Sequence, residues 1–333
     1  MIESLRDEFF KTFADKYKLL ENKPLGKGHY ACVFKAFDID RQIEVAIKIF
    51  FDGIAPKGSE RGWHISSSVI HSQIAQTSTI ENFRSKVLKR QCKAVVQRLI
   101  PGKTLKSLIE EFDSIEQSPN YQAVLNDFGL TYFPSLLTVL NFCHSQNFGH
   151  GDCHDGNIMV FLEQHDTLHS FRVVLIDFDN SSIKETLNAK TEKQKIESDI
   201  SLIKYFYKKV FSDWKFYEAI LIILNNYTSV SQYQLSYSIV SEYISKSIKG
   251  NNSTESIIKI LSKLPHPFMG FPISTTIESL RKVAEITNDI ENFELGLAEF
   301  KIAFAKPENW KHDFEIETIE IGVTDIYRKM FGS

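Results

Sequence analysis

The chain has 333 residues, 43% of them hydrophobic and 24% charged, and its formal net charge is −3. This composition supports a folded core and excludes a chain that is disordered throughout. The near balance of 39 basic and 42 acidic residues argues against a general nucleic-acid binder. We also expect no membrane partner. The N-terminal stretch lacks the basic-then-apolar pattern of a signal peptide, and the apolar run 219–224 is too short to span a bilayer.

The four cysteines are scattered and include no C-x-x-C pair. This pattern fits reduced thiols in a cytoplasmic protein better than a disulfide framework. We expect each of them to act as a small buried apolar residue: Cys32, Cys92, Cys143 and Cys153.

Residues 24 to 100 are expected to form mainly β-strands, because short apolar runs alternate with polar residues and turn signals. The expected strands are 24–38, 44–51, 82–89 and 93–100, with the last turn near 90–92. A helix is predicted over 59–78, although this stretch is rich in serine and β-branched residues. Pro101 and Gly102 then end the strand-rich part.

The chain after residue 101 is predicted to be mainly helical, because apolar residues recur at three- and four-residue spacings. The clearest helices are 104–112, 131–146, 198–211 and 217–227, and two short β-like runs cover 157–162 and 171–179. We therefore predict two parts, 1–100 and 101–333, with a helical C-terminal extension from about residue 200. Clefts between such parts commonly bind ligands.

The first candidate motif is a glycine-rich turn at residues 25–33. Gly26 and Gly28 would let the backbone approach phosphate oxygens closely. A G-x-G pair is a weak signal, and an ordinary hairpin turn explains it equally well. A Rossmann loop is excluded because a strand, not a helix, is expected to follow, and a Walker A loop because no GK[ST] ends it.

The second candidate is Lys48, which lies near the end of an apolar strand. Such a lysine is often simply solvated or protects an edge strand. Fifteen residues separate it from Val33, which is enough for a strand, a turn and a returning strand. That hairpin would place the Lys48 ammonium beside the glycine turn.

The third candidate is the stretch HGDCHDGN at 150–157, together with LIDFDN at 175–180. Asp152 and Asn157 are five residues apart across a tight turn, and Asp177 follows an apolar strand. Carboxylate and amide oxygens suit Mg²⁺, and phosphoryl transfer needs little beyond such ligands, a cation and a positioned carboxylate. A transition-metal site on His150, Asp152 and His154 would leave Gly26 and Lys48 without a role.

Together these motifs resemble the protein-kinase-like phosphotransferases, the superfamily that includes protein kinases and the aminoglycoside, choline and fructosamine kinases. The resemblance runs from about residue 19 to about residue 210. It implies an α+β, bilobal fold with a small antiparallel-sheet N-lobe. A larger, mainly helical C-lobe with extra C-terminal helices would follow, with ATP and Mg²⁺ as cofactors.

The resemblance also implies a role for each matching residue. Lys48 matches the phosphate-binding lysine, Asp152 the aspartate that orients the substrate hydroxyl, and Asn157 and Asp177 the magnesium ligands; Asp199 matches a structural aspartate. The nucleotide-binding positions that it implies are Gly26, Gly28 and Ala31 in the glycine loop, Val33 and Ala46 above the adenine, Met159 below it, Gln97 at the gatekeeper position, and Arg98, Leu99 and Ile100 in the hinge.

Several residues depart from the protein-kinase pattern. Gly151 stands where an arginine is expected and His154 where a lysine is common, and both resemble the small-molecule kinase version of the loop. Asp179 replaces the glycine of the DFG triplet. The glutamate that should pair with Lys48 is not clear from the sequence, and Glu60 is weakly favoured.

Three functions remain open. The first is a kinase that transfers the γ-phosphate of MgATP to a protein Ser or Thr, which we favour. The second is a small-molecule kinase of the aminoglycoside or choline type, which the loop departures and the long helical tail favour. The third is a catalytically inactive kinase-like scaffold, which the intact Lys48, Asp152, Asn157 and Asp177 oppose. Nothing in the sequence indicates an oligomeric state.

Overall fold

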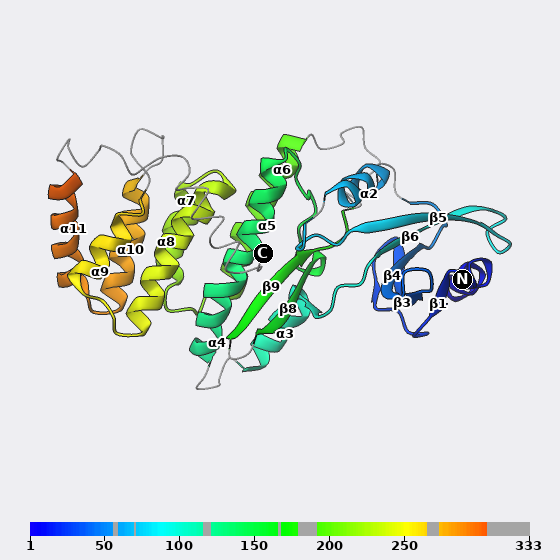
Figure 1. The fold of residues 1–333 in the computed structure, drawn as a ribbon, viewed down its shortest axis with the longest axis horizontal. Helices are drawn as coiled ribbons and strands as arrows, with labels where there is room; N and C mark the ends of the chain where they lie inside the picture. The colour runs from blue at the N-terminus through cyan, green and yellow to red at the C-terminus, as the bar shows by residue number, and fades with distance from the viewer. Residues whose placement is uncertain are drawn as a thin grey trace. The chain divides into compact units, whose positions relative to one another are not determined.

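The computed structural model describes seven stretches of the chain, and Figure 1 shows their fold. The chain divides into two compact units. Unit 1 comprises Met1–Tyr217 with Tyr227–Leu235, and unit 2 comprises Glu218–Asn226 with Ser236–Ser333. The predicted division at residue 100 falls inside unit 1 and stays a prediction about two lobes of that unit. The described stretches are 1–55, 59–69, 71–115, 121–165, 168–178, 192–264 and 273–304.

The N-terminal part of unit 1 is built on an antiparallel sheet, drawn in blue and cyan in Figure 1. Its strand order is β1-β3-β4-β6-β5, and β2 pairs with β3. The hairpin predicted from the spacing of Val33 and Lys48 is confirmed, because β3 and β4 pair along their whole length. The strands are β1 (Tyr17–Leu19), β2 (Gly26–Lys27), β3 (Ala31–Asp38), β4 (Ile43–Phe50), β5 (Thr77–Ser85) and β6 (Arg90–Arg98).

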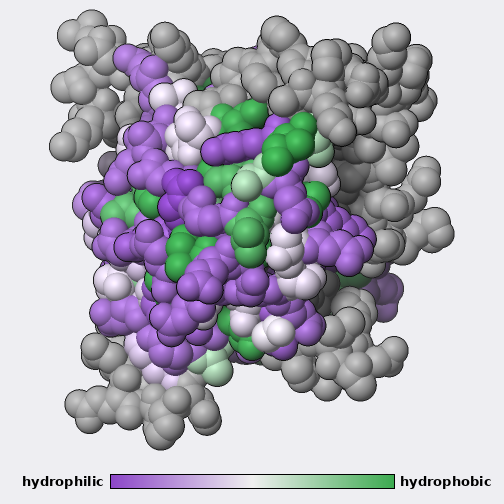
Figure 2. All heavy atoms as spheres, turned by 90° about the vertical axis from the view of Figure 1, so that its left-hand side faces the viewer, coloured by the Kyte–Doolittle hydropathy of each residue, from purple (hydrophilic) through white to green (hydrophobic). Residues whose placement is uncertain are grey.

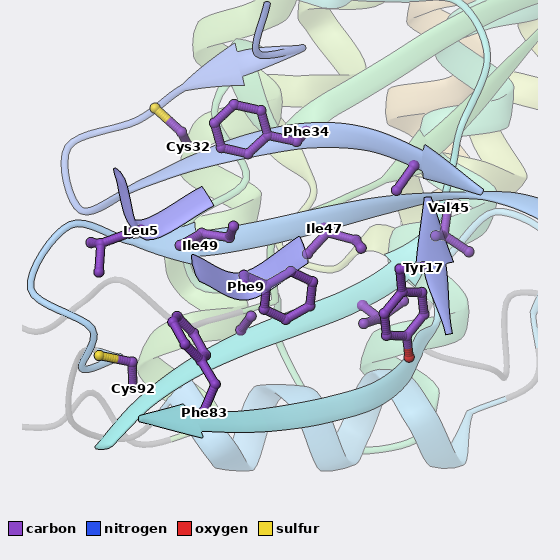
Figure 3. Packing of buried hydrophobic residues seen from close by; sticks show 13 residues of the cluster. Leu5, Phe9, Tyr17, Cys32, Phe34, Val45, Ile47, Ile49, Phe83 and Cys92 are labelled. Atoms are coloured by element: carbon purple, nitrogen blue, oxygen red, sulfur yellow. The ribbon is translucent and has the colours of Figure 1, made fainter. Parts of the chain in front are cut away.

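One face of this sheet is covered by α1 (Ile2–Thr12). Side chains alternate between the two faces of a strand, so every second residue of β3, β4 and β6 points toward this helix. Leu5 and Phe9 from α1 pack there against Ile47 of β4 and Phe83 of β5, and all four are buried (Figure 3). The opposite face is thereby left for α2 and the candidate site.

The segment after β4 differs from its prediction. Helix α2 covers only Ser59–Ser68, and the rest of the predicted helix belongs to a connecting segment and to β5. Its serines bond to carbonyls three residues earlier instead of extending the helix; Ser67 and Ser68 both do so near its end. The turn expected near 90–92 is also wrong, because β6 already begins at Arg90 and the turn lies at 86–89.

A long helical stretch, Tyr121–Ser145, runs through unit 1 as α4 (Tyr121–Asp127), a π-helical turn (Phe128–Tyr132) and α5 (Phe133–Ser145). Pro134 lacks the N–H that would bond back into this turn, which accounts for the local irregularity. The stretch is long and apolar enough to cross a membrane by length and composition, but half of its most apolar window is buried inside the protein. A core helix passes the same test, and α5 contacts β9 of the same unit.

The remaining elements follow in chain order. A short sheet, β7-β8-β9, contains the strand that follows the candidate catalytic loop (β8) and the strand that precedes Asp177 (β9). The expected α+β fold, with an antiparallel sheet first and a mainly helical part after it, is confirmed. These elements are β7 (Lys103–Thr104), α3 (Leu105–Ile115), a 3₁₀ turn (Asp155–Asn157), β8 (Ile158–His165), β9 (Leu168–Leu175), α6 (Glu192–Phe211), α7 (Tyr217–Asn226), α8 (Val230–Ile248), α9 (Thr254–Leu261), α10 (Ile273–Ile286) and α11 (Ile290–Phe304).

Unit 2 holds most of the predicted C-terminal helical extension, whereas the predicted helix 198–211 is part of α6 and belongs to unit 1. Figure 2 shows this part of the chain from the side of α11, where hydrophilic side chains surround small, separate apolar patches. Leu295 and Ile302 are exposed apolar residues of α11. Scattered exposure of this kind is normal for a protein surface.

Candidate active site

The sheet register places three candidate residues in one row. Gly26 of β2 is paired with Val33 of β3, and Val33 is paired with Lys48 of β4. Neighbouring strands lie about 4.8 Å apart, so Lys48 lies two strands from the glycine turn and on its level. The proximity expected from the spacing in the sequence is therefore present.

The glycine turn leaves open space above its backbone. A Cβ atom built on Gly26 would have no heavy atom within 4 Å, and one on Gly28 would meet only the Ala31 carbonyl oxygen at 3.7 Å. Neither glycine is required by packing or by a positive φ. The open space fits a loop over which phosphate groups lie close to the backbone.

Lys48 and Asp177, which are 129 residues apart in the chain, meet in the site. The Lys48 ammonium lies 2.7 Å from Oδ1 of Asp177. Only 11% of the lysine side chain is exposed, against 35% of the aspartate, so the pair is partly desolvated. Asp177 has a φ of 60°, a left-handed conformation that is uncommon outside glycine and typical of functional sites.

The glutamates considered as partners for Lys48 are both engaged elsewhere. Glu60, the one carboxylate of α2, contacts the ammonium of Lys93. Glu81 accepts a hydrogen bond from the hydroxyl of Tyr17 at 3.0 Å. Its partner in the register is Ala94, whose side chain faces α1, so Glu81 lies on the opposite face of the sheet from Lys48. The expectation for Glu60 is not supported.

Asp152 and Asn157 are held together across the tight turn. The Asn157 side-chain amide donates to the backbone carbonyl of Asp152 at 2.9 Å and to its Oδ2 at 3.1 Å. Asn157 is buried, whereas the Asp152 side chain is 32% exposed. The amide therefore fixes the carboxylate while one side of it faces solvent.

Asp199 of α6 anchors the start of this loop through hydrogen bonds to its backbone. Its carboxylate has no exposed surface and accepts hydrogen bonds from the backbone N–H groups of His150 (2.8 Å) and Gly151 (2.9 Å). It also lies 3.1 Å from Nε2 of His144. Gly151 has a φ of 78°, so an arginine at this position would be strained. The structural part expected for Asp199 agrees with these contacts.

His150 links the two chemical segments. Its Nδ1 accepts the backbone N–H of Asp152 at 3.3 Å, and its Nε2 lies 2.8 Å from the carbonyl oxygen of Ile176. Because a carbonyl only accepts, the proton must be on Nε2. Ile176 in turn donates its N–H to the carbonyl of Asn157 at 3.0 Å. Nδ1 thus binds the backbone of Asp152 and Nε2 the backbone next to Asp177, so neither nitrogen is free to bind a metal.

His154 is a second polar side chain near Asp152 in the same loop, after Asn157. Its Nδ1 accepts the N–H of Gly156 at 3.0 Å, and its Nε2 lies 3.7 Å from Oδ2 of Asp152. Half of the side chain is exposed. This arrangement suits a donor that supports the Asp152 carboxylate.

Five further positions were expected to surround the base of a nucleotide. Ala46 and Gln97 are partners in the β4–β6 register. Ile100 and Met159 belong to one apolar cluster, and Val33 on β3 is half-buried. The structure therefore brings these residues together in two pairs, and their roles stay predictions.

Gln73 is a residue that sequence reasoning missed, because it was placed inside a helix. It lies in the segment after α2, is 2% exposed, and donates its amide to Ser135 of α5 and to the carbonyl of Val173 in β9. Gln73 thus ties the connection between α2 and β5 to the helix before the catalytic loop and to the strand before Asp177. A polar residue followed by the apolar pair Ile74 and Ala75 was the available signal.

Two further residues can be placed briefly. Cys153 is buried, as expected for the four cysteines, and burial raises the pKa of its thiol well above the ordinary range. Asp179 lies outside the described residues.

The chain is similar to a protein family and to individual known proteins. A family model described as "Protein kinase domain" matches residues 19–198, which is more than half of the chain. The DNA damage response protein kinase DUN1 of Saccharomyces cerevisiae is 28% identical over 156 residues, covering 45% of this chain and 28% of that protein. The chain thus corresponds to less than a third of this relative. The crystal structure of Rad53 1–466 in complex with AMP-PNP matches 68% of this chain and 61% of that chain, with 18% identity and a TM-score of 0.42.

Proposed function

The chain belongs to the protein kinase domain family and is a phosphotransferase of that class, and we propose that it transfers the γ-phosphate of MgATP to a Ser or Thr hydroxyl of a protein. The observation that carries the proposal is the meeting of Lys48 and Asp177 at 2.7 Å, beside a loop in which Asn157 holds Asp152. This reaction needs a lysine ammonium for the phosphates, two oxygen ligands for a metal ion and a positioned carboxylate.

Each residue has a separate task in this proposal. MgATP supplies the phosphoryl group and the divalent cation that neutralises its charge. Lys48 binds the α- and β-phosphate oxygens, and Asp177 and Asn157 provide oxygen ligands for the cation. Asp152 accepts or orients the proton of the attacking hydroxyl, and Asn157 keeps it in position.

The nucleotide base would lie between the two lobes of unit 1. We assign Val33 and Ala46 to its upper side and Met159 to its lower side. Gln97 and Ile100 would lie at its edge, where the backbone after β6 offers hydrogen bonds. The support is the placement of Ala46 opposite Gln97 and of Ile100 next to Met159.

A protein acceptor is favoured because the curated relative is, by its name, a protein kinase. A small hydroxyl-bearing acceptor is the second candidate, and Gly151 and His154 favour it. Gly151 uses a left-handed conformation in which the usual arginine would be strained, and His154 caps its own turn through Gly156.

Turnover of ATP in point variants tests the common part of both candidates. We expect Asp152→Ala to lower kcat by about 10²- to 10⁴-fold, the range for loss of a general base. Asp177→Ala should abolish turnover, because a cation ligand and the Lys48 partner are lost together. Glu60→Gln is the control, because its exposed carboxylate contacts Lys93 away from the site. Unchanged activity in both aspartate variants would refute the proposal.

The acceptor class is tested by mass spectrometry after incubation with MgATP alone. Phosphate on serine or threonine of the protein itself supports a protein acceptor. ATP binding without any phosphorylated residue favours a small acceptor.

We also propose a cytoplasmic location, as the cysteine pattern suggests. All four cysteines are free and buried. Reduced, buried thiols are typical of proteins in a reducing compartment.

A further inference from the structure

Helix α2 carries no acidic side chain toward Lys48. Glu60 is its one carboxylate, and the chain has no further aspartate or glutamate before Glu81. The residues of α2 that turn toward the sheet include Trp63 (1% exposed) and Ser66 (fully buried). Ser66 donates to Oγ1 of Thr77 in β5 at 2.8 Å. The helix is therefore docked through an indole ring and a hydroxyl.

The indole of Trp63 packs on Phe50 of β4. The two ring centroids are 6.0 Å apart and the rings are tilted by 38°. Both residues belong to a buried cluster with Ala31, which follows the glycine turn, and Val95, the register partner of Lys48. One apolar cluster thus touches the helix, the glycine turn and the lysine strand.

Phe50 also lies within cation–π distance of the lysine. It lies two residues after Lys48 on the same strand, so both side chains leave the same face of the sheet. The Lys48 ammonium lies 5.7 Å from the centroid of the Phe50 ring. That distance is within the range of a cation–π interaction, which is stronger when the cation is desolvated, as this one is.

We propose that Phe50 and Trp63 are positioning residues for Lys48: α2 presses Trp63 onto Phe50, and the Phe50 ring holds the ammonium against Asp177. Contact between α2 and the lysine is thereby aromatic and does not depend on an ion pair from the helix. The inference rests on the proposed function, because it assumes that Lys48 binds the phosphates of the nucleotide.

The test measures nucleotide binding and lysine reactivity in matched variants. Phe50→Leu keeps an apolar side chain but removes the ring, and Trp63→Leu removes the ring that supports it. We expect KM for ATP to rise roughly three- to tenfold in both, the fold-change that corresponds to a contact of about 0.7–1.4 kcal/mol. KM for the acceptor should not change, and Trp63→Phe should restore most of the ATP affinity.

Lysine orientation is read by the rate at which N-hydroxysuccinimide acetate modifies Lys48, followed by peptide mass spectrometry. We expect faster modification in Phe50→Leu, because the ammonium loses a contact. Ile80→Ala is the packing control, since Ile80 packs against the same cluster from β5. It should lower the unfolding temperature without changing either readout.

The outcomes separate the inference from the function. If Lys48→Ala weakens ATP binding but Phe50→Leu and Trp63→Leu do not, the positioning role is wrong and the function stands. If Lys48→Ala leaves ATP binding unchanged, the proposed function itself fails. If Ile80→Ala raises KM for ATP as much as Phe50→Leu, the cluster acts through general packing and the specific contact is refuted.

Discussion

At the scale of single residues, Asp199 is the buried anchor of the loop that carries Asp152. Its fully buried carboxylate accepts the N–H groups of His150 and Gly151. We expect Asp199→Ala to lower the free energy of unfolding by about 3–5 kcal/mol, because buried donors lose their acceptor. Urea denaturation measures this. Asp7→Ala is the control, because its carboxylate is 66% exposed and should change stability little. A loss below about 1 kcal/mol for Asp199→Ala would contradict the anchoring role.

The Tyr132 hydroxyl is buried and has no hydrogen-bond partner within the described part of the chain. Burial raises the pKa of this hydroxyl well above its usual value, so it stays protonated. We expect Tyr132→Phe to leave stability unchanged or to raise it by up to about 1–2 kcal/mol, since an unsatisfied polar group is removed. Tyr233→Phe is the comparison, because that hydroxyl donates to the Tyr227 carbonyl at 2.8 Å. Equal losses in both would mean that a bound water satisfies Tyr132.

His71 predicts a pH dependence of stability. Its ring is stacked on Phe142 with centroids 4.3 Å apart, and burial, helped by Arg172, lowers the pKa of the imidazole. The unfolded chain therefore binds this proton more readily than the folded one. No stability is lost at a pH above the unfolded pKa of about 6.5, and stability falls as the pH drops below it.

Thermal unfolding of His71→Phe between about pH 7.5 and pH 5 checks this prediction. The variant keeps the ring stack but loses the acceptor for the N–H of Gln73. At high pH, His71→Phe should unfold at a lower temperature than the wild type. On acidification, its unfolding temperature should fall less than that of the wild type. His64→Asn, at an exposed position, should leave the slope unchanged. An unchanged slope in His71→Phe would show that other groups cause the acid sensitivity.

The sequence predicted the candidate site better at positions whose chemistry is local. Asp152 and Asn157 are five residues apart in one turn. The place of Lys48 beside the glycine turn follows from the length of one hairpin. The partner of Lys48 could not be predicted, because it depends on which face of the sheet each side chain leaves and on the exact end of α2. Gln73 was missed for a related reason: its partners lie 62 and 100 residues away.

At the scale of elements, the errors lie where two secondary structures compete for the same residues. The stretch 59–78 has helix-compatible apolar spacing, but its second half contains Thr77 and other β-branched residues that fit a strand better. Pairing of β5 with β6 decides the outcome, because this hairpin extends back to Thr77, which lies opposite Gln97. The β3–β4 hairpin was predicted correctly, because no helical pattern competes for its residues.

Helix α1 predicts a further element-scale result. Phe9 is fully buried, and its ring lies 5.6 Å from that of Phe83 and 6.0 Å from that of Tyr17. We expect Phe9→Ala to cost about 3–5 kcal/mol of unfolding free energy, because a large cavity opens between the helix and the sheet. Lys11→Ala, on the exposed side of the same helix, is the control. Equal stability of the two variants would show that α1 does not support the sheet.

At the scale of the whole molecule, the chain passes between the two units more than once. Helix α7 belongs to unit 2 for most of its length, and the next segment, Tyr227–Leu235, returns to unit 1. There Gln234 accepts a hydrogen bond from Asn141 of α5 at 2.8 Å and donates to Thr138 at 3.2 Å. A fragment that ends at Tyr217 would lack these contacts, so a kinase fragment of this chain should extend past Leu235.

Nucleotide binding should distinguish the two units during thermal unfolding. All the residues proposed to bind MgATP lie in unit 1. A ligand that binds only the folded state stabilises it by about 2.7 kcal/mol at a concentration of 100 Kd. We therefore expect MgATP to raise the temperature of the calorimetric transition that contains unit 1. Phe9→Ala identifies that transition by lowering it.

A core variant of unit 2 completes the experiment. Ile257 is 1% exposed, and its side chain lies so close to Gly296 of α11 that a Cβ there would meet it at 2.7 Å. Ile257→Ala should destabilise unit 2 by about 2–5 kcal/mol. If the units unfold separately, MgATP raises the transition lowered by Phe9→Ala and leaves the one lowered by Ile257→Ala in place. If both variants lower one shared transition, the chain unfolds as a single cooperative body, and the assignment of nucleotide stabilisation to unit 1 alone is wrong.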